Sequence, residues 1–377
     1  MDSKKNVHIG GVFYGMHNIG DEAILYSMLR QFYEKYRISV ESYDSKWLLN
    51  YYPDVRIRPI IIAYGKPKLG IAMMPRKKII TNTVKQFRNR GFIQKIDGYI
   101  CGGATILSDC PWHSLKTVEE AGRLGKDVIL WGVGMADGVD QVTKQYIRSV
   151  LNRSYVSKIY TRDEFVKERL KEIGVKAEKL GVSYDPAIML SGKEFDLKKY
   201  MSNESIEMLY NDRKNICVSV SGEADVAFRT PVDAIYGFTK QLLMRGHYNI
   251  YFIPTGCGKH CKDKEIMERI VQQCDSKYVR MIDKEFEPDD LVQFLKMFDF
   301  SISSRLHLNI FSACAGIPSI GLIRNSKITD FAQIFDFPVL EMDTLTAEKL
   351  LENVELIEHK MNEFRSEIPK KVTEMRK

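Results

Sequence analysis

Residues 301–327 read S-I-S-S-R-L-H-L-N-I-F-S-A-C-A-G-I-P-S-I-G-L-I-R-N-S-K, and this stretch decides the fold. An apolar run at 298–302 leads directly into a polar corner at 303–307, and an amphipathic segment then extends to Gly316. A second apolar run, 319–323, follows the glycine. Strand, polar corner, helix, glycine turn and strand form a βαβ unit, which predicts a parallel sheet with helices against it.

The polar corner collects side chains that suit an anion. Ser303, Ser304, Arg305 and His307 follow the first strand, and Lys327 follows the next one. Ligands of open α/β sheets bind outside the carboxyl ends of the strands, where a parallel sheet brings these five residues together. Hydroxyl, guanidinium, imidazole and ammonium groups at one edge favour a small, strongly anionic ligand. The structural alternative for His307 is a polar residue that caps a helix.

Length and composition indicate a two-domain globular protein. The chain has 377 residues, of which 44% are hydrophobic and 28% charged. At about 150 residues per domain, this length suggests two domains. No apolar run is long enough for a transmembrane helix, and the N-terminus lacks the apolar core of a signal peptide, so we expect a cytoplasmic protein. Seven scattered cysteines, an odd number, favour free thiols over a disulfide framework.

The net charge of +7 is concentrated in one segment. Its cations are Lys66, Lys68, Arg76, Lys77, Lys78, Lys85, Arg88 and Arg90. A solvated helix face and loop explain such a segment. A second interpretation is a patch that rests on an anionic membrane surface, at the inner face of the membrane, or on a phosphate-bearing acceptor. No DNA- or RNA-binding motif accompanies the charge, so nucleic acid is not an expected partner.

Alternating apolar runs and amphipathic segments continue through the first half of the chain. The predicted strands are 7–15, 38–43, 98–101, 128–131 and 157–160, and the predicted helices include 23–36, 114–124 and 139–151. Several strands end at a glycine or a charged residue, and Gly20, Gly102, Gly103 and Arg162 lie at these ends. The loop before Gly20 is not a Walker A loop, because Gly-Lys-Ser/Thr is missing.

A second alternation begins after a polar stretch. Its predicted strands are 215–220, 249–253, 278–281, 298–302, 319–323 and 338–341, and its predicted helices are 231–245, 262–274, 288–297 and 344–365. The predicted organisation is an N-terminal Rossmann-like domain at 1–190, a linker region at 191–213, a C-terminal Rossmann-like domain at 214–343, and a helix with a fraying charged tail at 344–377. Two such domains facing across a cleft make the α/β glycosyltransferase-B-like arrangement.

Three stretches together resemble the polysaccharide pyruvyl transferase family. The first is G-V-F-Y-G-M-H-N-I-G-D-E-A-I-L at 11–25. The second combines G-G-A-T-I-L-S-D at 102–109 with T-R-D at 161–163 and Y-D-P-A at 184–187. The third is the 301–318 stretch with Lys327 behind it. The match runs in order from about residue 9 to residue 335, and Ser-Arg-Leu-His with the downstream lysine is its most specific part.

The resemblance implies transfer of pyruvate from phosphoenolpyruvate onto two sugar hydroxyls, which forms a cyclic ketal in a cell-wall polymer or exopolysaccharide precursor. It also implies functional roles for residues at the matching positions. The resulting assignment has His307, Arg162 and Lys327 as catalytic residues. The substrate-binding set is Asn18, Gly20, Asp21, Gly102, Gly103, Ser303, Ser304 and Arg305. Phosphoenolpyruvate is then a substrate, and neither a cofactor nor a metal is expected; a sugar or lipid-linked glycan is the acceptor, and the oligomeric state stays open.

The chemistry of the residues agrees with this assignment and leaves alternatives. Histidine, with an ordinary pKa of about 6.5, suits proton transfer, while arginine and lysine suit a carboxylate and a phosphate. However, Arg162 could pair with Asp163 or Glu164, Asn18 could cap a helix or form a turn, and Asp21 could be a first-turn acid. A nucleotide-sugar glycosyltransferase of the same fold, or a catalytically silent sugar-binding partner in polysaccharide assembly, are the competing functions.

Some positions depart from the family pattern. Ala104 stands where the family has a third glycine, Met135-Ala136-Asp137 replaces an expected Ile-Gly-Pro, and Arg324 replaces an aromatic residue. These changes put the loop shape and the acceptor in doubt. A possible zinc cluster of Cys257, His260, Cys261 and Cys274 lacks a second ligand pair at zinc-site spacing, so we interpret it as a turn with free thiols.

Overall fold

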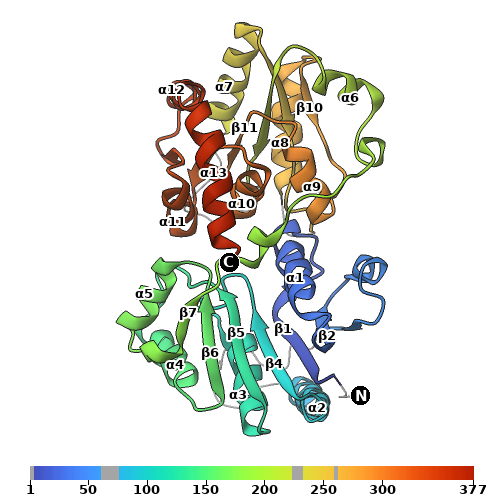
Figure 1. The fold of residues 1–377 in the computed structure, drawn as a ribbon, viewed down its shortest axis with the longest axis vertical. Helices are drawn as coiled ribbons and strands as arrows, with labels where there is room; N and C mark the ends of the chain where they lie inside the picture. Colours follow the sequence, from blue (N-terminus) through green and yellow to red (C-terminus); the bar gives the residue numbers. More distant parts are fainter. Residues whose placement is uncertain (1–3, 61–75, 223–231, 259–261) are drawn as a thin grey trace. The chain divides into compact units, whose positions relative to one another are not determined.

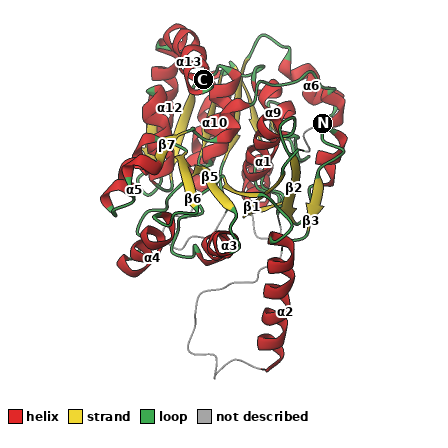
Figure 2. Cartoon of the chain, turned by 60° about the horizontal axis from the view of Figure 1, so that its bottom comes forward, coloured by secondary structure: helices red, strands yellow, loops and turns green. Residues whose placement is uncertain are grey.

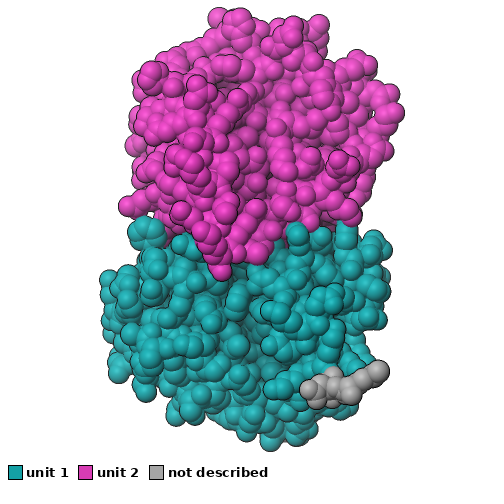
Figure 3. All heavy atoms as spheres, in the orientation of Figure 1, with its two compact units in different colours: residues 1–16, 24–186 teal, residues 17–23, 187–377 magenta. Residues whose placement is uncertain are grey.

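The computed structural model describes residues 4–60, 76–222, 232–258 and 262–377. The chain divides into two compact units (Figure 3). The first consists of residues 1–16 and 24–186, and the second of residues 17–23 and 187–377. Two features differ from the domain prediction: the main division falls at 186/187, and seven residues near the N-terminus belong to the second unit.

The first unit is built on a parallel sheet with the strand order β3-β2-β1-β4-β5-β6-β7. The strands are β1 (Asn6–Tyr14), β2 (Arg37–Ser42), β3 (Arg56–Arg58), β4 (Gly98–Gly102), β5 (Asp127–Val133), β6 (Val156–Thr161) and β7 (Leu180–Val182). The helices are α1 (Ile19–Phe32), α2 (Arg76–Ile93), α3 (Trp112–Arg123), α4 (Gln141–Leu151) and α5 (Glu164–Glu172), of which α1 begins within the second unit. Nearly continuous apolar runs form the central strands because helices cover a parallel sheet on both faces.

The second unit repeats this architecture with the strand order β10-β9-β8-β11-β12-β13 (Figure 1). Its strands are β8 (Lys214–Ser219), β9 (Tyr248–Phe252), β10 (Val279–Met281), β11 (Phe300–Ser303), β12 (Ser319–Ile323) and β13 (Val339–Glu341). Its helices are α6 (Asn203–Leu209), α7 (Val232–Arg245), α8 (Asp263–Cys274), α9 (Pro288–Leu295), α10 (Leu306–Ala315), α11 (Ser326–Phe335), α12 (Ala347–His359) and α13 (Met361–Met375). Short 3₁₀ turns occupy Lys46–Asn50, Ala177–Lys179, Pro186–Met189 and Leu197–Lys199.

Both sheets reverse their strand order next to their first strand, as in Rossmann folds. The reversal falls between β1 and β4 in the first unit and between β8 and β11 in the second. The predicted class of two parallel-sheet α/β units is therefore confirmed. The βαβ unit predicted from the 301–327 stretch is also confirmed as β11, α10 and β12, and Gly316 ends α10 with a φ of 80°.

The prediction of a fraying tail after residue 365 is wrong. Helix α13 extends to Met375 and buries Phe364, Ile368, Val372 and Met375. These residues recur every three to four positions, which is the spacing of one helix face. The charged residues between them hid this pattern. The predicted linker at 191–213 contains α6 and belongs to the second unit.

None of the helices in the described ranges combines the length and the apolar character that crossing a bilayer requires.

Candidate functional site

The carboxyl edge of the second sheet carries most of the predicted site residues. Strands β9, β8, β11 and β12 lie side by side and end in four neighbouring loops. Helices α8, α10 and α11 begin directly after three of these loops. The strand order reverses here, between β8 and β11, and a doubly wound sheet binds its ligands at such a point.

Ser303 and Ser304 hold the corner together through backbone contacts. The Ser303 hydroxyl accepts a hydrogen bond from the Arg305 N–H at 2.9 Å and donates one to the Arg305 carbonyl at 3.0 Å. The Ser304 hydroxyl accepts a bond from the Ser221 N–H at 2.8 Å. Both serines are buried, with exposed fractions of 0% and 2%. Their predicted role as ligands of the substrate stays a prediction, whereas their structural role is visible.

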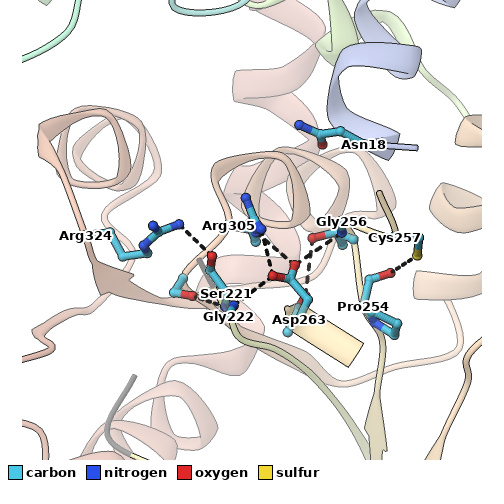
Figure 4. Close-up of polar contacts among 12 residues, drawn as sticks. Asn18, Ser221, Gly222, Pro254, Gly256, Cys257, Asp263, Arg305 and Arg324 are labelled. Atoms are coloured by element: carbon cyan, nitrogen blue, oxygen red, sulfur yellow. Dashed lines mark hydrogen bonds and ion pairs between the residues drawn. The ribbon is translucent and has the colours of Figure 1, made fainter. Parts of the chain in front are cut away.

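Arg305 makes a two-point contact with Asp263 (Figure 4). Its Nε and Nη2 atoms lie 3.0 Å and 2.7 Å from the two carboxylate oxygens. Asp263 is fully buried and also accepts the backbone N–H groups of Gly222, at 2.8 Å, and Gly256, at 3.2 Å. The guanidinium predicted to clamp a substrate anion is thus paired with a carboxylate of the chain itself. Sequence reasoning missed Asp263, whose only signal was its place at the start of a predicted helix.

Residues 17–19 pair with the loop that follows β9. Ile19 donates its N–H to the Thr255 carbonyl at 3.1 Å, and Cys257 donates its N–H to the His17 carbonyl at 2.7 Å. Asn18 and Gly256 form an antiparallel bridge between these two contacts. Sequence reasoning had placed residues 17–23 in the N-terminal domain, at the end of its first strand. The pairing explains why they belong to the second unit.

His307 lies directly against Gly20. Both are second residues of their helices, α10 and α1. A Cβ atom added to Gly20 would lie 2.0 Å from Nδ1 and 2.3 Å from Cγ of His307. Such distances are impossible for non-bonded atoms, so only glycine allows the imidazole to occupy this position. The structure therefore brings Gly20 and His307 together, although 287 positions separate them.

Asn18 and Asp21 complete the start of α1. The Asn18 side-chain oxygen accepts the Gly20 N–H at 3.2 Å, its backbone carbonyl accepts the Glu22 N–H at 3.1 Å, and its amide nitrogen donates to Asp21 at 2.9 Å. The capping role that the sequence offered as an alternative for Asn18 is present. His17, at a φ of 59°, pairs with Glu285 at 2.9 Å.

Two further cations follow β12. Arg324 comes directly after the strand and donates from Nη1 to the Ser221 hydroxyl at 2.7 Å. Lys327 is the second residue of α11, and its side chain is partly exposed. The N-cap residues of α10 and α11, Arg305 and Asn325, provide no side-chain cap to their helices. The first-turn N–H groups and the positive ends of these two helix dipoles favour a bound anion.

The other predicted residues lie in the first unit. Gly102 and Gly103 end β4, and Cβ atoms there would approach Met28 and Ile24 of α1 to 2.4 Å and 2.1 Å. Close packing of α1 on the strand end thus accounts for both glycines. Ala104 follows with a φ of 56°, in the left-handed region that glycine prefers.

Arg162 follows β6 and is buried, with an exposed fraction of 6%. Its Nε lies 3.3 Å from the Asp163 carboxylate, and its Nη1 donates to the Thr105 hydroxyl at 3.1 Å. Asp163 also caps α5 by accepting the Val166 N–H at 2.7 Å. The ion pair that the sequence offered as an alternative for Arg162 is therefore present.

The predicted site residues consequently divide between the units. The second unit holds Asn18, Gly20, Asp21, Ser303, Ser304, Arg305, His307 and Lys327, and the first holds Gly102, Gly103 and Arg162. Among the described residues no group of three or more His, Cys, Asp or Glu side chains could hold a metal ion, and the six cysteines in those ranges are free. His260 and Cys261 of the possible zinc cluster lie outside the described residues.

Comparison with known proteins decides the family. The model of the polysaccharide pyruvyl transferase family matches residues 18–326. The chain belongs to the polysaccharide pyruvyl transferase family. This match begins at Asn18 and ends at Ser326, so it includes residues of both units. The family is one of transferases, and this pyruvyl transferase family member is accordingly an enzyme. No curated protein matches the sequence.

Solved structures share the fold of this pyruvyl transferase family member. A UDP co-structure of MnaA from S. aureus is 14% identical, has a TM-score of 0.65, and covers 97% of this chain and 91% of that chain. For a putative UDP-N-acetylglucosamine 2-epimerase from Listeria monocytogenes the values are 11%, 0.64, 96% and 91%. Anabaena HepE in complex with UDP-glucose has 9%, 0.59, 99% and 97%. At such identities the likeness concerns the fold alone, which is glycosyltransferase-B-like.

Proposed function

We propose that the enzyme transfers pyruvate from phosphoenolpyruvate onto two hydroxyls of a sugar in a cell-surface polysaccharide precursor, forming a cyclic ketal. The observation that carries this proposal is the position of His307 and Lys327 in the first turns of α10 and α11, which follow the neighbouring strands β11 and β12. Family membership supplies the reaction class, and this edge supplies a proton-transfer group beside anion-binding helix ends.

The donor carries a phosphate and a carboxylate, so its site needs fixed positive charge and N–H donors. The first turns of α10 and α11 offer backbone N–H groups, and Lys327 adds a point charge. Arg324, directly after β12, is a second candidate because its guanidinium reaches Ser221 after β8. Arg305 contributes through Asp263 and the shape of the corner more than through free charge.

The reaction needs one group that gives and takes protons near neutral pH. His307 as a general acid protonates the methylene carbon of the donor, which places positive charge on the neighbouring carbon. A sugar hydroxyl attacks that carbon and loses its proton. A second hydroxyl then bonds to the same carbon, loses its proton, and displaces phosphate to close the ketal. Cations at the edge stabilise the departing phosphate. The steps are written without a metal or a cofactor.

Arg162 is the predicted catalytic residue of the first unit. Its guanidinium is buried and fixed by Asp163 and Thr105, which suits a residue that must present charge in one orientation. The two glycines at the end of β4 belong to the same unit and keep their assignment as substrate-binding residues on the strength of the family motif.

Ligand-induced thermal stabilisation tests the donor. Phosphoenolpyruvate, UDP and GDP are compared on the parent and on His307→Ala, Arg324→Gln and Lys327→Ala, with Lys370→Ala on α13 as a matched control. A ligand at one hundred times its Kd stabilises the native state by about 2.7 kcal/mol. We expect stabilisation by phosphoenolpyruvate alone, reduced in Lys327→Ala and retained in Lys370→Ala. Stabilisation by a nucleotide instead would identify a nucleotide-sugar glycosyltransferase, and a response to none of the three would favour a silent sugar-binding partner.

The basic segment suggests where the enzyme works. Residues 61–75 lie outside the described residues, but 76–93 form α2, which projects from the rest of the first unit (Figure 2). This helix has six Lys or Arg residues and no Asp or Glu. Val84 and Phe87 are exposed to 51% and 69% beside the exposed Arg88. Cations flanking exposed apolar side chains suit the inner face of an anionic membrane, where a lipid-linked acceptor would lie.

Vesicle binding tests this location. Phe87→Ser with Arg88→Glu should reduce sedimentation with phosphatidylglycerol vesicles, while neutral phosphatidylcholine vesicles should bind weakly throughout. Val142→Ser on α4 removes a side chain that is 71% exposed and serves as the control. Equal binding by the parent and the double variant would contradict membrane contact through α2.

A further inference from the structure

A closed ring of contacts in the second unit surrounds the corner that carries His307. We infer that Asp263 is the positioning residue that fixes the His307 imidazole through this ring. The ring consists of Asp263, Arg305, the loop after β9, residues 17–20 and His307 itself. Its catalytic consequence rests on the proposed function, whereas its geometry does not.

The first link joins Asp263 to Arg305. Both carboxylate oxygens receive guanidinium N–H groups, at 2.7 Å and 3.0 Å, and the side chains are 0% and 14% exposed. A two-point contact of this kind fixes direction as well as distance, because the guanidinium fork and the carboxylate are both planar. Arg305 is the N-cap of α10, so the contact sets where that helix begins.

The second link joins Asp263 to the loop after β9. The Gly256 N–H donates to Oδ2 at 3.2 Å, and on the other side the Gly222 N–H donates to Oδ1 at 2.8 Å. One buried carboxylate therefore holds the loops of two adjacent strands. The residues flanking Gly256 make the two backbone bonds to His17 and Ile19, so the position of the 17–20 segment depends on this loop.

The third link closes the ring at His307. Gly20 packs against the imidazole so closely that a methyl group there would overlap Nδ1. Arg305 lies only two residues before His307, at the start of the same helix. The imidazole is thus held between two segments, α10 and residues 17–20, and Asp263 contacts or indirectly fixes both.

The bonding pattern of Asp263 makes it sensitive to a small change. Each carboxylate oxygen accepts one guanidinium N–H and one backbone N–H. Asparagine replaces one of these oxygens by an NH₂ group, which would face two donors and could accept from neither. Asp263→Asn must therefore release one side of the ring, although it keeps the size of the side chain.

Nuclear magnetic resonance of the His307 imidazole in the ligand-free protein tests the inference. The His307 resonances are assigned with His307→Gln, and the measurement needs no substrate. We expect Asp263→Asn to shift and broaden them. Asp290→Asn is the matched control, because Asp290 is also buried and accepts the Tyr200 hydroxyl at 2.6 Å outside the ring. A folded Asp263→Asn variant with parental His307 resonances would overturn the inference.

Two other variants keep the test decisive if Asp263→Asn does not fold. Arg305→Lys preserves the buried charge pair and gives up the two-point contact, so the His307 resonances should move; parental resonances would again count against the ring. Gly20→Ala should displace the imidazole, while Gly91→Ala, a helical glycine with nothing within 4 Å of the added Cβ, should leave it in place.

Kinetics extends the test to catalysis. A displacement of the reacting group by about 1 Å can cost on the order of 10²-fold in rate, so Asp263→Asn should lower the turnover number far more than it raises KM for phosphoenolpyruvate. A merely structural role would lower Tm and leave the turnover of the folded fraction unchanged. If phosphoenolpyruvate does not bind the parent, the proposed function fails while the resonance measurement still decides the ring.

Discussion

Arg162 and Arg305 occupy equivalent positions in the two units, at the carboxyl edge of a parallel sheet, yet they are held in different ways. Arg162 contacts the carboxylate of the next residue, Asp163, with one nitrogen at 3.3 Å. Arg305 contacts Asp263, 42 positions away, with two nitrogens at 3.0 Å and 2.7 Å. The first pair is local, and the second joins two segments that are distant in the sequence.

This difference shows where each unit can be disturbed. Asp163 keeps a second task, capping α5, so the first corner retains part of its structure without Arg162. Asp263 has no such local task and ties together the loops after β8 and β9. The corner of the second unit should therefore respond more strongly to loss of its arginine, although both arginines are largely buried.

The largest expected effect is on this pair of arginines. Arg305→Met should lower the free energy of unfolding of the second unit by about 3–5 kcal/mol, because the Asp263 carboxylate stays buried without its cation. Arg162→Met should cost the first unit about 1–3 kcal/mol, since Asp163 keeps its bond from Val166. Urea unfolding of both variants, fitted with separate transitions for the units, measures the two losses. Equal losses would remove the distinction.

Acid should then distinguish the units, because the first has its own long-range polar contacts inside the sheet. Burial lowers the pKa of His8 to about 4, against the opposing charge of Glu41. Between pH 6.5 and pH 4 the unfolded chain binds a proton that folded His8 does not. Stability is therefore complete above pH 6.5 and falls as the pH drops, by about 3 kcal/mol at pH 4.

Urea unfolding of the first unit between pH 7 and pH 4.5 measures this slope. His8→Gln should flatten it, and His247→Gln, at an exposed position, should not. The other groups around His8 are Ser39, Arg58 and Tyr99, and they are unchanged in both variants. A parental slope in His8→Gln would show that the buried imidazole does not control the response.

A smaller effect sharpens the comparison at the hydroxyl groups. Ser304→Ala should cost about 1–3 kcal/mol, because the buried Ser221 N–H loses its acceptor. Thr105→Ala removes one acceptor from Arg162, which keeps its contact with Asp163, so its cost should stay below about 1 kcal/mol. Thermal unfolding of the two variants provides the measurement, and a larger loss in Thr105→Ala would reverse the ranking of the two corners.

The smallest expected effect is a gain of stability. Ala104 adopts a φ of 56°, where a Cβ atom is strained, so Ala104→Gly should stabilise the first unit by about 1 kcal/mol. Ala315→Gly at the end of α10 should destabilise by roughly the same amount, because glycine is a poor helix former. Tm values that fall in both variants would indicate that Ala104 is not strained.

The sequence alone determined the two α/β alternations, the βαβ unit at 301–327 and the identity of the polar corner. Those properties depend on near neighbours, since a buried strand needs an apolar run and a strand end needs a turn. The pairing of Arg162 with Asp163 and the capping by Asn18 are also local, and the sequence offered both as alternatives.

Only the tertiary structure decided which distant residues meet. Asp263 has no motif of its own, and its partner Arg305 became visible only when β8, β9 and β11 were placed side by side. Likewise, residues 17–23 join the second unit through backbone hydrogen bonds to the loop after β9. Backbone groups are the same in every residue, so no sequence pattern records which of them will pair.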